Sequence, residues 1–259
     1  MTNDPVCTAA DPVADWHPLD NPARASLLGP HAHFAEGHGQ ALRYPAQMCP
    51  FTALPDEPDA GSWRDVATLL GPGGLAVLAA TRVLPPPDWE LVFNGAAVQL
   101  VDDRMAEATD SEATNSEATN SEVPDSEAIA LGPDDVPEMI ALVKLTKPGP
   151  FLPRTIELGN YLGIRRDGAL VAMAGERLRP PGWTEVSAVC THPAYRGQGF
   201  ASRLTHAVVA GIRARGETPF LHAEAANTNA LRLYQALGFR PRGRVHFRVA
   251  RVPAGEPGG

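Results

Sequence analysis

Hydrophobic and polar positions alternate most regularly in the second half of the chain. Strand-like apolar runs are predicted at 129–131, 161–165, 170–178, 183–191, 220–225 and 245–250. Apolar residues at helical spacing predict helices at 134–145, 200–215 and 228–237. Asp167-Gly168 is typical of a hairpin turn between two of these strands. The order β-α-β-β-β-α-β-α-β predicts an α/β fold, a mixed sheet covered by helices.

The first half shows a weaker pattern. A helix is predicted over 63–70, and Gly71-Pro-Gly-Gly74 then breaks the chain. Strands are predicted at 75–80 and 91–101. We interpret residues 16–104 as a small N-terminal α/β domain without a recognisable motif.

A low-complexity segment separates the two halves. Ser111-Glu-Ala-Thr-Asn115 repeats at 116–120 and then decays. The segment is acidic and nearly free of bulky apolar side chains, so it cannot bury enough surface to offset its ordering entropy. We expect a disordered acidic linker over 105–127, a folded domain over 128–252, and disordered ends at 1–15 and 253–259.

The charge of the chain is divided unevenly. Its formal net charge is -8, which argues against a nucleic-acid partner. Residues 1–127 carry 20 acidic and 5 basic side chains, whereas residues 128–251 carry 9 acidic and 17 basic ones. The basic half suits an anionic ligand, although attraction between the two halves would also explain the asymmetry.

Three classes of site or location are disfavoured. Cys7, Cys49 and Cys190 have no CxxC spacing, which gives no indication of a disulfide framework or a thiolate zinc site. No apolar run is long enough to span a membrane, and the N-terminus lacks signal-peptide character, so we expect a cytoplasmic protein. A histidine-rich stretch matches no strong metal motif, and we predict no metal at His31, His33, Glu36 and His38.

The most informative segment joins the strand at 183–191 to the helix at 200–215. Gly197 and Gly199 allow the backbone to approach an anion without obstruction by a Cβ atom. The N–H groups at the start of the helix point towards such an anion, and Arg196 adds a charge-assisted donor. This combination suits a pyrophosphate.

At these residues the sequence resembles the GNAT superfamily of N-acetyltransferases. The acyl-CoA motif of that family, Arg/Gln-x-x-Gly-x-Gly/Ala, is met by Arg196, Gly199 and Ala201. A second block, Asn227-Thr-Asn-Ala-Leu-Arg-Leu-Tyr-Gln-Ala-Leu-Gly-Phe239, is similar to the last strand-helix pair of the family. The resemblance covers about 129–251 and leaves the N-terminal half unexplained.

The resemblance implies a GNAT-like fold and acetyl-CoA as cosubstrate, with direct transfer of the acetyl group to a primary amine and no metal. It implies that the backbone at 189–191 holds the pantetheine arm and polarises the acyl carbonyl. The cofactor contacts that it implies are Val189, Cys190, Thr191, Arg196, Gly197, Gln198, Gly199, Phe200, Ala201 and Asn227. Asn227 would equally suit the cap of the following helix.

The resemblance also places the groups that move protons. Tyr234 lies where the family has the acid that protonates the leaving thiolate, although a buried aromatic of an amphipathic helix would fit the same position. The base is less defined by the sequence. Our candidate is Glu185, on the strand that leads to the glycine-rich loop, with Glu176, His222 and Glu224 as competitors.

Other functions stay open at this point. Gly197-Gln-Gly199 could begin a dinucleotide fingerprint, but Ser202 replaces its third glycine and antiparallel strands precede it. A non-catalytic acyl-CoA-binding or interaction module is the main alternative. The acceptor is undefined: a small amine, an amino acid, an antibiotic, a protein N-terminus or a lysine would all serve.

Three roles are open for the N-terminal half. It could be a degenerate GNAT-like unit that completes a two-lobed enzyme, or it could shape the acceptor site. It could instead make the contact of a homodimer. Its acidic character would favour a cationic acceptor if it faced the cleft.

Overall fold

The computed structural model describes residues 17–102 and 127–254 of the chain. The predicted linker therefore lies outside the described residues except for Glu127. The predicted ends lie outside them as well, apart from Pro253 and Ala254. The prediction that these segments are disordered is left untested.

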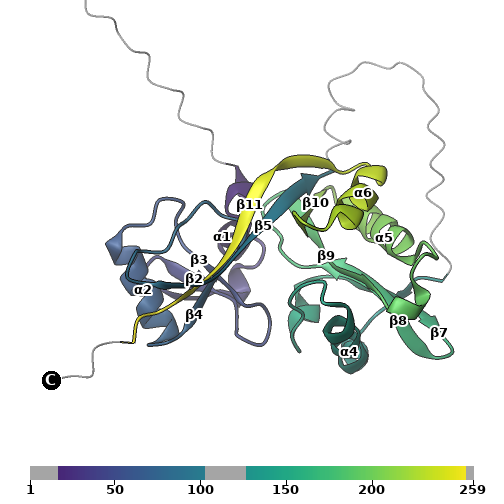
Figure 1. The fold of residues 1–259 in the computed structure, drawn as a ribbon, viewed down its shortest axis with the longest axis horizontal. Coiled ribbons are helices and arrows are strands. Elements are labelled where there is room, and N and C mark those ends of the chain that lie inside the picture. Colours follow the sequence, from purple (N-terminus) through teal and green to yellow (C-terminus); the bar gives the residue numbers. More distant parts are fainter. Residues whose placement is uncertain (1–16, 103–126, 255–259) are drawn as a thin grey trace, which may run out of the picture.

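One continuous mixed sheet runs through the molecule (Figure 1). Its strands lie in the order β1-β2-β3-β4-β11-β5-β10-β9-β8-β7-β6. The N-terminal strands are β1 (Glu36–His38), β2 (Ala41–Arg43), β3 (Phe51–Ala53), β4 (Leu75–Leu78) and β5 (Glu90–Val101). The later strands are β6 (Ile129–Ala130), β7 (Tyr161–Arg166), β8 (Ala169–Glu176), β9 (Trp183–Thr191), β10 (Thr218–Glu224) and β11 (Arg240–Arg251).

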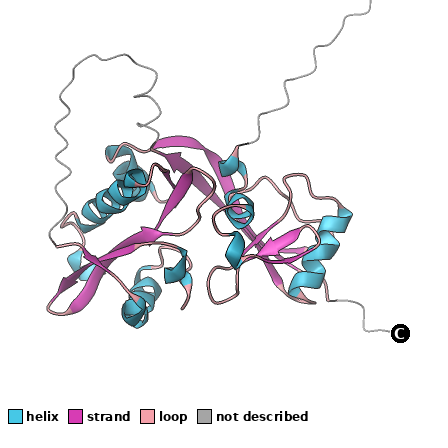
Figure 2. Cartoon of the chain, turned by 180° about the vertical axis from the view of Figure 1, so that it is seen from behind, coloured by secondary structure: helices cyan, strands magenta, loops and turns pink. Residues whose placement is uncertain are grey.

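Helices pack on this sheet at both of its ends (Figure 2). The α-helices are α1 (Pro22–Leu28), α2 (Ala60–Leu70), α4 (Val136–Thr146), α5 (Phe200–Ala214) and α6 (Thr228–Ala236). Short 3-10 turns are η1 (Pro18–Asp20), η2 (Ala32–Phe34), η3 (Pro133–Asp135), η4 (Thr155–Leu158) and η5 (Pro193–Tyr195). The prediction of a mixed α/β fold is confirmed.

The two longest strands, β5 and β11, join the halves of the chain. They pair antiparallel along almost their whole length. β5 also pairs with β10, from Ala97 to Val101, and β11 also pairs with β4, from Arg248 to Arg251. A boundary near residue 104 therefore does not separate the sheet, because β5 lies between two strands of the second half.

Both halves repeat one arrangement of strands and helix. β3, α2 and β4 form a parallel crossover unit, with β2 antiparallel to β3 and β1 antiparallel to β2. β9, α5 and β10 form the same unit, with β8 and β7 in the matching places. This internal repeat is consistent with a degenerate second copy of the domain, which stays a prediction.

Candidate functional site

The strands β9 and β10 separate near the middle of the sheet. They pair in parallel at only three positions, which end at Glu185 and Phe220. Beyond that point β9 continues to Thr191 and β10 to Glu224, and the described residues show no further pairing between them. The opening leaves one edge of β9 able to pair with an extended ligand as with an added strand.

A β-bulge redirects the backbone of β9 at this opening. Cys190 pairs with Met173 and Ser187 pairs with Gly175, so two residues of β9 face one residue of β8. Ala188, inside the bulge, has φ +54°, which is unfavourable for a residue with a side chain. Bulges of this kind re-aim backbone groups beside functional sites. The bulge includes Val189 and leads into Cys190 and Thr191, and these three residues form the segment that we predict to hold the pantetheine arm.

The glycine-rich loop lies at the end of β9. Arg196, Gly197, Gln198 and Gly199 are all exposed. Gly197 and Gly199 adopt φ values of +79° and +76°, and a Cβ atom at either position would point into open space. Their glycine identity is therefore required by backbone conformation and not by crowding.

The helix α5 begins directly after this loop without a side-chain cap. Gly199 occupies the N-cap position, so no side chain accepts a hydrogen bond from the first N–H groups of the helix. The equivalent helix of the first half, α2, is capped by Asp59, whose Oδ1 accepts from the Ser62 N–H at 2.7 Å. Of the helix starts of α5 and α2, that of α5 is free to receive an anion, because Asp59 occupies that of α2.

Phe200 opens α5 with its side chain turned into the protein. The ring is buried in the core cluster around α5, and the guanidinium carbons of Arg166 and Arg203 lie 4.9 and 5.6 Å from its centroid. Glu127 bridges the two arginines at 3.0 and 2.6 Å. Phe200 therefore offers a ligand its backbone N–H only, beside two cationic side chains.

Tyr234 lies on α6, buried in the core cluster beneath the opening. Its ring packs edge-to-face on Phe239, with the centroids 6.0 Å apart. Burial raises the pKa of Tyr234 to about 12, and the nearby Cys190 adds to the increase. The phenol therefore holds its proton at neutral pH, as a proton donor to a thiolate must.

Cys190 is also buried, and burial raises the pKa of its thiol to about 11. It is therefore protonated at neutral pH and unsuited to nucleophilic attack.

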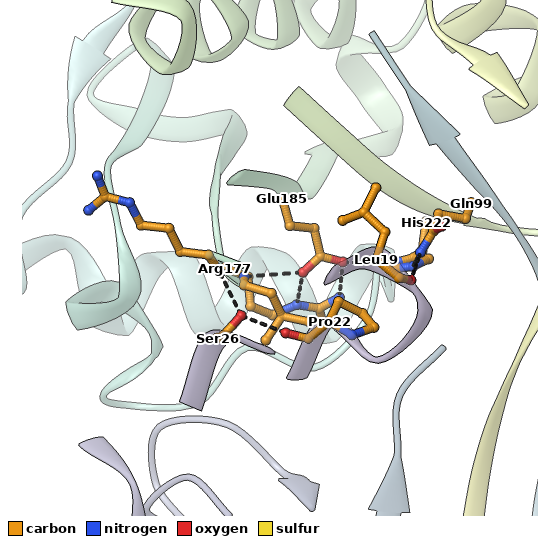
Figure 3. Close-up of polar contacts among 9 residues, drawn as sticks. Leu19, Pro22, Ser26, Gln99, Arg177, Glu185 and His222 are labelled. Carbon is orange, nitrogen blue, oxygen red and sulfur yellow. Dashed lines mark hydrogen bonds and ion pairs between the residues drawn. The ribbon is translucent and has the colours of Figure 1, made fainter. Parts of the chain in front are cut away.

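Glu185, the predicted base, is part of a buried ion pair (Figure 3). Its carboxylate accepts two hydrogen bonds from the Arg177 guanidinium at 2.8 and 2.9 Å, and its Oε1 lies 2.8 Å from His222 Nδ1. Burial alone would raise the pKa of Glu185, but Arg177 and His222 hold it well below the usual value. A carboxylate with both oxygens occupied and such a low pKa is a poor base, so these contacts argue against our prediction that Glu185 is the base.

His222 is held on both ring nitrogens. Its Nε2 lies 3.0 Å from the Gln99 Nε2 atom, which also donates to the Leu19 carbonyl at 2.9 Å. The Gln99 Oε1 atom accepts from Arg242 at 2.9 Å, and this fixes the orientation of the amide. Every donor then has an acceptor if His222 carries its proton on Nδ1 and donates it to Glu185. This arrangement leaves no lone pair on the ring for proton removal.

Two further acidic candidates differ in their surroundings. Glu176 is buried and occupied by Arg215 at 2.9 Å and by the Asn160 N–H at 3.3 Å. Glu224 is exposed at the end of β10, where this strand pairs with β5 but, among the described residues, not with β9, and alternation places it on the same face as His222. Of the four candidates, Glu224 alone is accessible at the opening.

Asn227 caps α6, because its Oδ1 accepts from the Ala230 N–H at 3.1 Å. The capping role left open by the sequence is thus present, and a contact to CoA stays a prediction.

In the histidine-rich stretch, His31 is buried against the Tyr44 hydroxyl at 3.0 Å, and burial lowers its pKa to about 4. Within 17–102 and 127–254 no three potential ligands lie close enough to hold a metal, and no helix could cross a membrane.

Sequence reasoning missed the partners of Glu185. Arg177, which pairs with Glu185, and Gln99, which lies against His222, carry no motif, and neither neighbours Glu185 in the sequence. The bulge at Ala188 has no signal in the sequence either, since alanine is unusual at positive φ.

Comparisons with known proteins show which proteins the chain resembles in sequence and fold. The sequence profile described as "FR47-like protein" matches residues 161–249. The solved structure of a GNAT-family protein from Novosphingobium aromaticivorans is 38% identical, covering 90% of this chain and 98% of that one, with a TM-score of 0.76. No curated protein matches the sequence significantly.

Two more distant structures share the fold along most of the chain. A GCN5-related N-acetyltransferase from Kribbella flavida is 18% identical with a TM-score of 0.54, and covers 92% of this chain and 96% of that one. A GCN5-related N-acetyltransferase-like protein from Streptococcus suis is 15% identical with a TM-score of 0.50, and covers 92% and 94%. Both span the N-terminal half, so that half is a recurrent part of the fold.

Proposed function

The chain belongs to the GNAT family, and from this premise we propose that it transfers an acetyl group from acetyl-CoA to a primary amine within a ternary complex. The observation that carries the proposal is the opening between β9 and β10 beside the uncapped start of α5. The opening between the strands suits the extended pantetheine arm, and the uncapped start of α5 suits the pyrophosphate. A non-catalytic acyl-CoA-binding module is the alternative.

The acyl-CoA contacts follow from this arrangement. Arg196 and the N–H groups from Gly197 to Ala201 bind the phosphates at the helix terminus. The pantetheine arm pairs with Val189 and Thr191 along the free edge of β9, next to the bulge. A backbone N–H of this segment polarises the thioester carbonyl, since a fixed donor stabilises the oxyanion that forms there.

The transfer itself balances with two protein groups. An ammonium acceptor first gives one proton, through water, to Glu224. The amine nitrogen then attacks the thioester carbon, the C–S bond breaks, and the CoA thiolate takes a proton from Tyr234. The second nitrogen proton passes through water to the Tyr234 phenolate, Glu224 releases its proton to solvent, and an amide, CoA thiol and one proton remain.

The variant Tyr234→Phe tests both the role of Tyr234 as the acid and the proposal that the protein is an enzyme. We expect kcat to fall by about 100-fold, because a general acid commonly contributes that much. Acetyl-CoA affinity should stay unchanged, since the ring keeps its packing on Phe239. Release of CoA thiol with a panel of amines gives kcat, and calorimetry gives the affinity. Full turnover in the variant would remove Tyr234 from the mechanism.

Glu224→Gln tests the assignment of the base. We expect kcat/KM to fall by about 100-fold near neutral pH and to recover as the pH rises, when solvent deprotonates the amine. Glu176→Gln, a buried control, should leave the pH profile of activity in place. An unchanged pH profile for Glu224→Gln would exclude this residue as the base. If no amine were acetylated by a protein that binds acetyl-CoA, the binding-module alternative would be favoured.

A further inference from the structure

A cavity of about 520 Å³ lies away from the acyl-CoA loop, between β11, the loop that follows β4, and η1. β4 pairs with β11 only from Arg248 to Arg251, so the edge of β11 before Arg248 has no neighbouring strand from β4. This edge forms one wall. The lining residues are Leu19, Asp20, Ala80, Thr81, Arg82, Leu84, Arg242, Gly243, Arg244, Val245, His246 and Arg248.

The lining is strongly cationic. It contains four arginines but a single carboxylate, Asp20, which is already paired with Arg242 at 2.8 Å. Among the described residues, no carboxylate pairs with Arg82, Arg244 or Arg248. The excess positive charge therefore faces the cavity.

Arg248 is the buried member of the group, and only 8% of its surface is exposed. Its Nη1 atom donates to the Thr81 and Val83 carbonyls at 2.9 and 3.2 Å, whereas its Nε atom has no partner among the described residues. Burial lowers the pKa of its guanidinium. A buried cation without a counter-ion is costly unless an anion lies close to it.

The wall opposite β11 is held in an unusual conformation. Ala80 is buried at φ +53°, a conformation that costs free energy for a residue with a side chain. The loop that it begins then presents the two carbonyls that hold Arg248 in the wall. The cavity is thus lined by backbone of defined conformation as well as by the exposed Arg82 and Arg244.

We propose that this cavity binds a small molecule carrying at least two carboxylate or phosphate groups. Planar guanidinium groups suit either kind of oxyanion, because both accept paired N–H donors. The volume is in the range of small-molecule sites. None of the lining residues belongs to the acyl-CoA loop, so the site is separate from the proposed cofactor site.

Calorimetric titration of the full chain in low-chloride buffer tests the proposal, with citrate as the carboxylate probe and pyrophosphate as the phosphate probe. We expect saturable binding of at least one probe, weakened by about tenfold or more in Arg248→Met. Arg251→Met is the matched control on the same strand, because Arg251 is exposed and pairs with Glu90 at 2.7 Å. It should bind as the wild type does.

Two further variants decide the remaining outcomes. Because the acyl-CoA loop also suits pyrophosphate, citrate decides the location: Arg196→Ala should leave citrate binding unchanged, and a loss there would place the anion at the acyl-CoA loop and overturn the proposal. Arg244→Gln, at an exposed position, should fold normally and weaken binding several-fold. If Arg248→Met does not fold, this variant alone decides. Absence of saturable binding, or equal binding by wild type and Arg244→Gln, would contradict the proposal.

Discussion

Gly199→Glu is expected to weaken acetyl-CoA binding by at least about 100-fold. Gly199 occupies the N-cap of α5 at φ +76°, so a side chain there strains the backbone of the phosphate loop. The added carboxylate also stands at the positive end of the helix, where it competes with the phosphates. Calorimetric titration of the variant with acetyl-CoA measures the effect.

The control for this variant is Gly71→Glu. Gly71 also has a positive φ, +75°, and open space around its Cβ position, but it ends α2 in the other half of the chain. Its ψ is 167°, against 4° at Gly199, a combination that glycine alone adopts readily, so the control imposes at least as much backbone strain without touching the proposed site. We expect it to bind acetyl-CoA as the wild type does. Equal loss in both variants would show that general destabilisation, and not the phosphate loop, explains the effect.

Glu185→Leu is expected to lower the free energy of unfolding by about 3–5 kcal/mol. The substitution leaves the Arg177 guanidinium buried without its counter-ion, stacked on Phe51 at 4.8 Å. Combining it with Arg177→Met should restore most of the loss, because an apolar pair replaces the ion pair. Restoration is incomplete since His222 Nδ1 loses its acceptor. Urea unfolding measures each variant.

A surface pair provides the comparison. Glu36 and Arg43 lie 2.8 Å apart but are well exposed, so Glu36→Gln should change the unfolding free energy by less than about 1 kcal/mol. A loss as small as this in Glu185→Leu would contradict the buried-pair account.

The buried pair of Glu185 and Arg177 also predicts a dependence of stability on pH. The pKa of Glu185 is lower in the folded protein than its ordinary value of 4.5, so the pair contributes stability at higher pH. That contribution is lost as the pH falls below about 4.5 towards the folded value. Wild type should therefore lose stability in acid more steeply than Glu185→Gln, which has no carboxylate to protonate.

The backbone of the glycine-rich loop that we propose to bind acyl-CoA could be predicted from sequence because its determinants are local. Gly197, Gly199 and Arg196 lie within four residues, and the helix that follows has a clear apolar period. The same holds for α6 and for the hairpin at Asp167-Gly168, whose positive φ values agree with the predicted turn.

The environment of Glu185 could not be predicted because it depends on residues that meet only in the fold. Arg177 comes from beyond the end of β8, His222 from β10 and Gln99 from β5. The strand pattern at 183–191 does not say what covers the face that carries Glu185. The N-terminal half covers it, through Leu19 and Phe51, which the sequence left without a role.

The position of β5 in the sheet could not be predicted from sequence for a similar reason. Residues 91–101 have a strand pattern, but the pattern does not identify the neighbouring strands. The pairing with β10 and β11 spans more than a hundred residues of sequence. The very short strands β1, β2 and β3 have too few residues to show a period, and our sequence analysis did not predict them.

The repeat of strands and helix in the two halves makes the number of acyl-CoA sites informative. In the first half the equivalent helix is capped by Asp59, and the loop before it also contains Asp56 and Glu57. Carboxylates at that terminus repel phosphates. We therefore predict one acyl-CoA site per chain.

Calorimetric titration of the wild-type chain with acetyl-CoA tests this central claim most directly. We predict saturable binding in the micromolar range, with one site per chain. No binding by a folded protein would contradict the assignment of an acyl-CoA site, and two equivalent sites would contradict the distinction between the two halves.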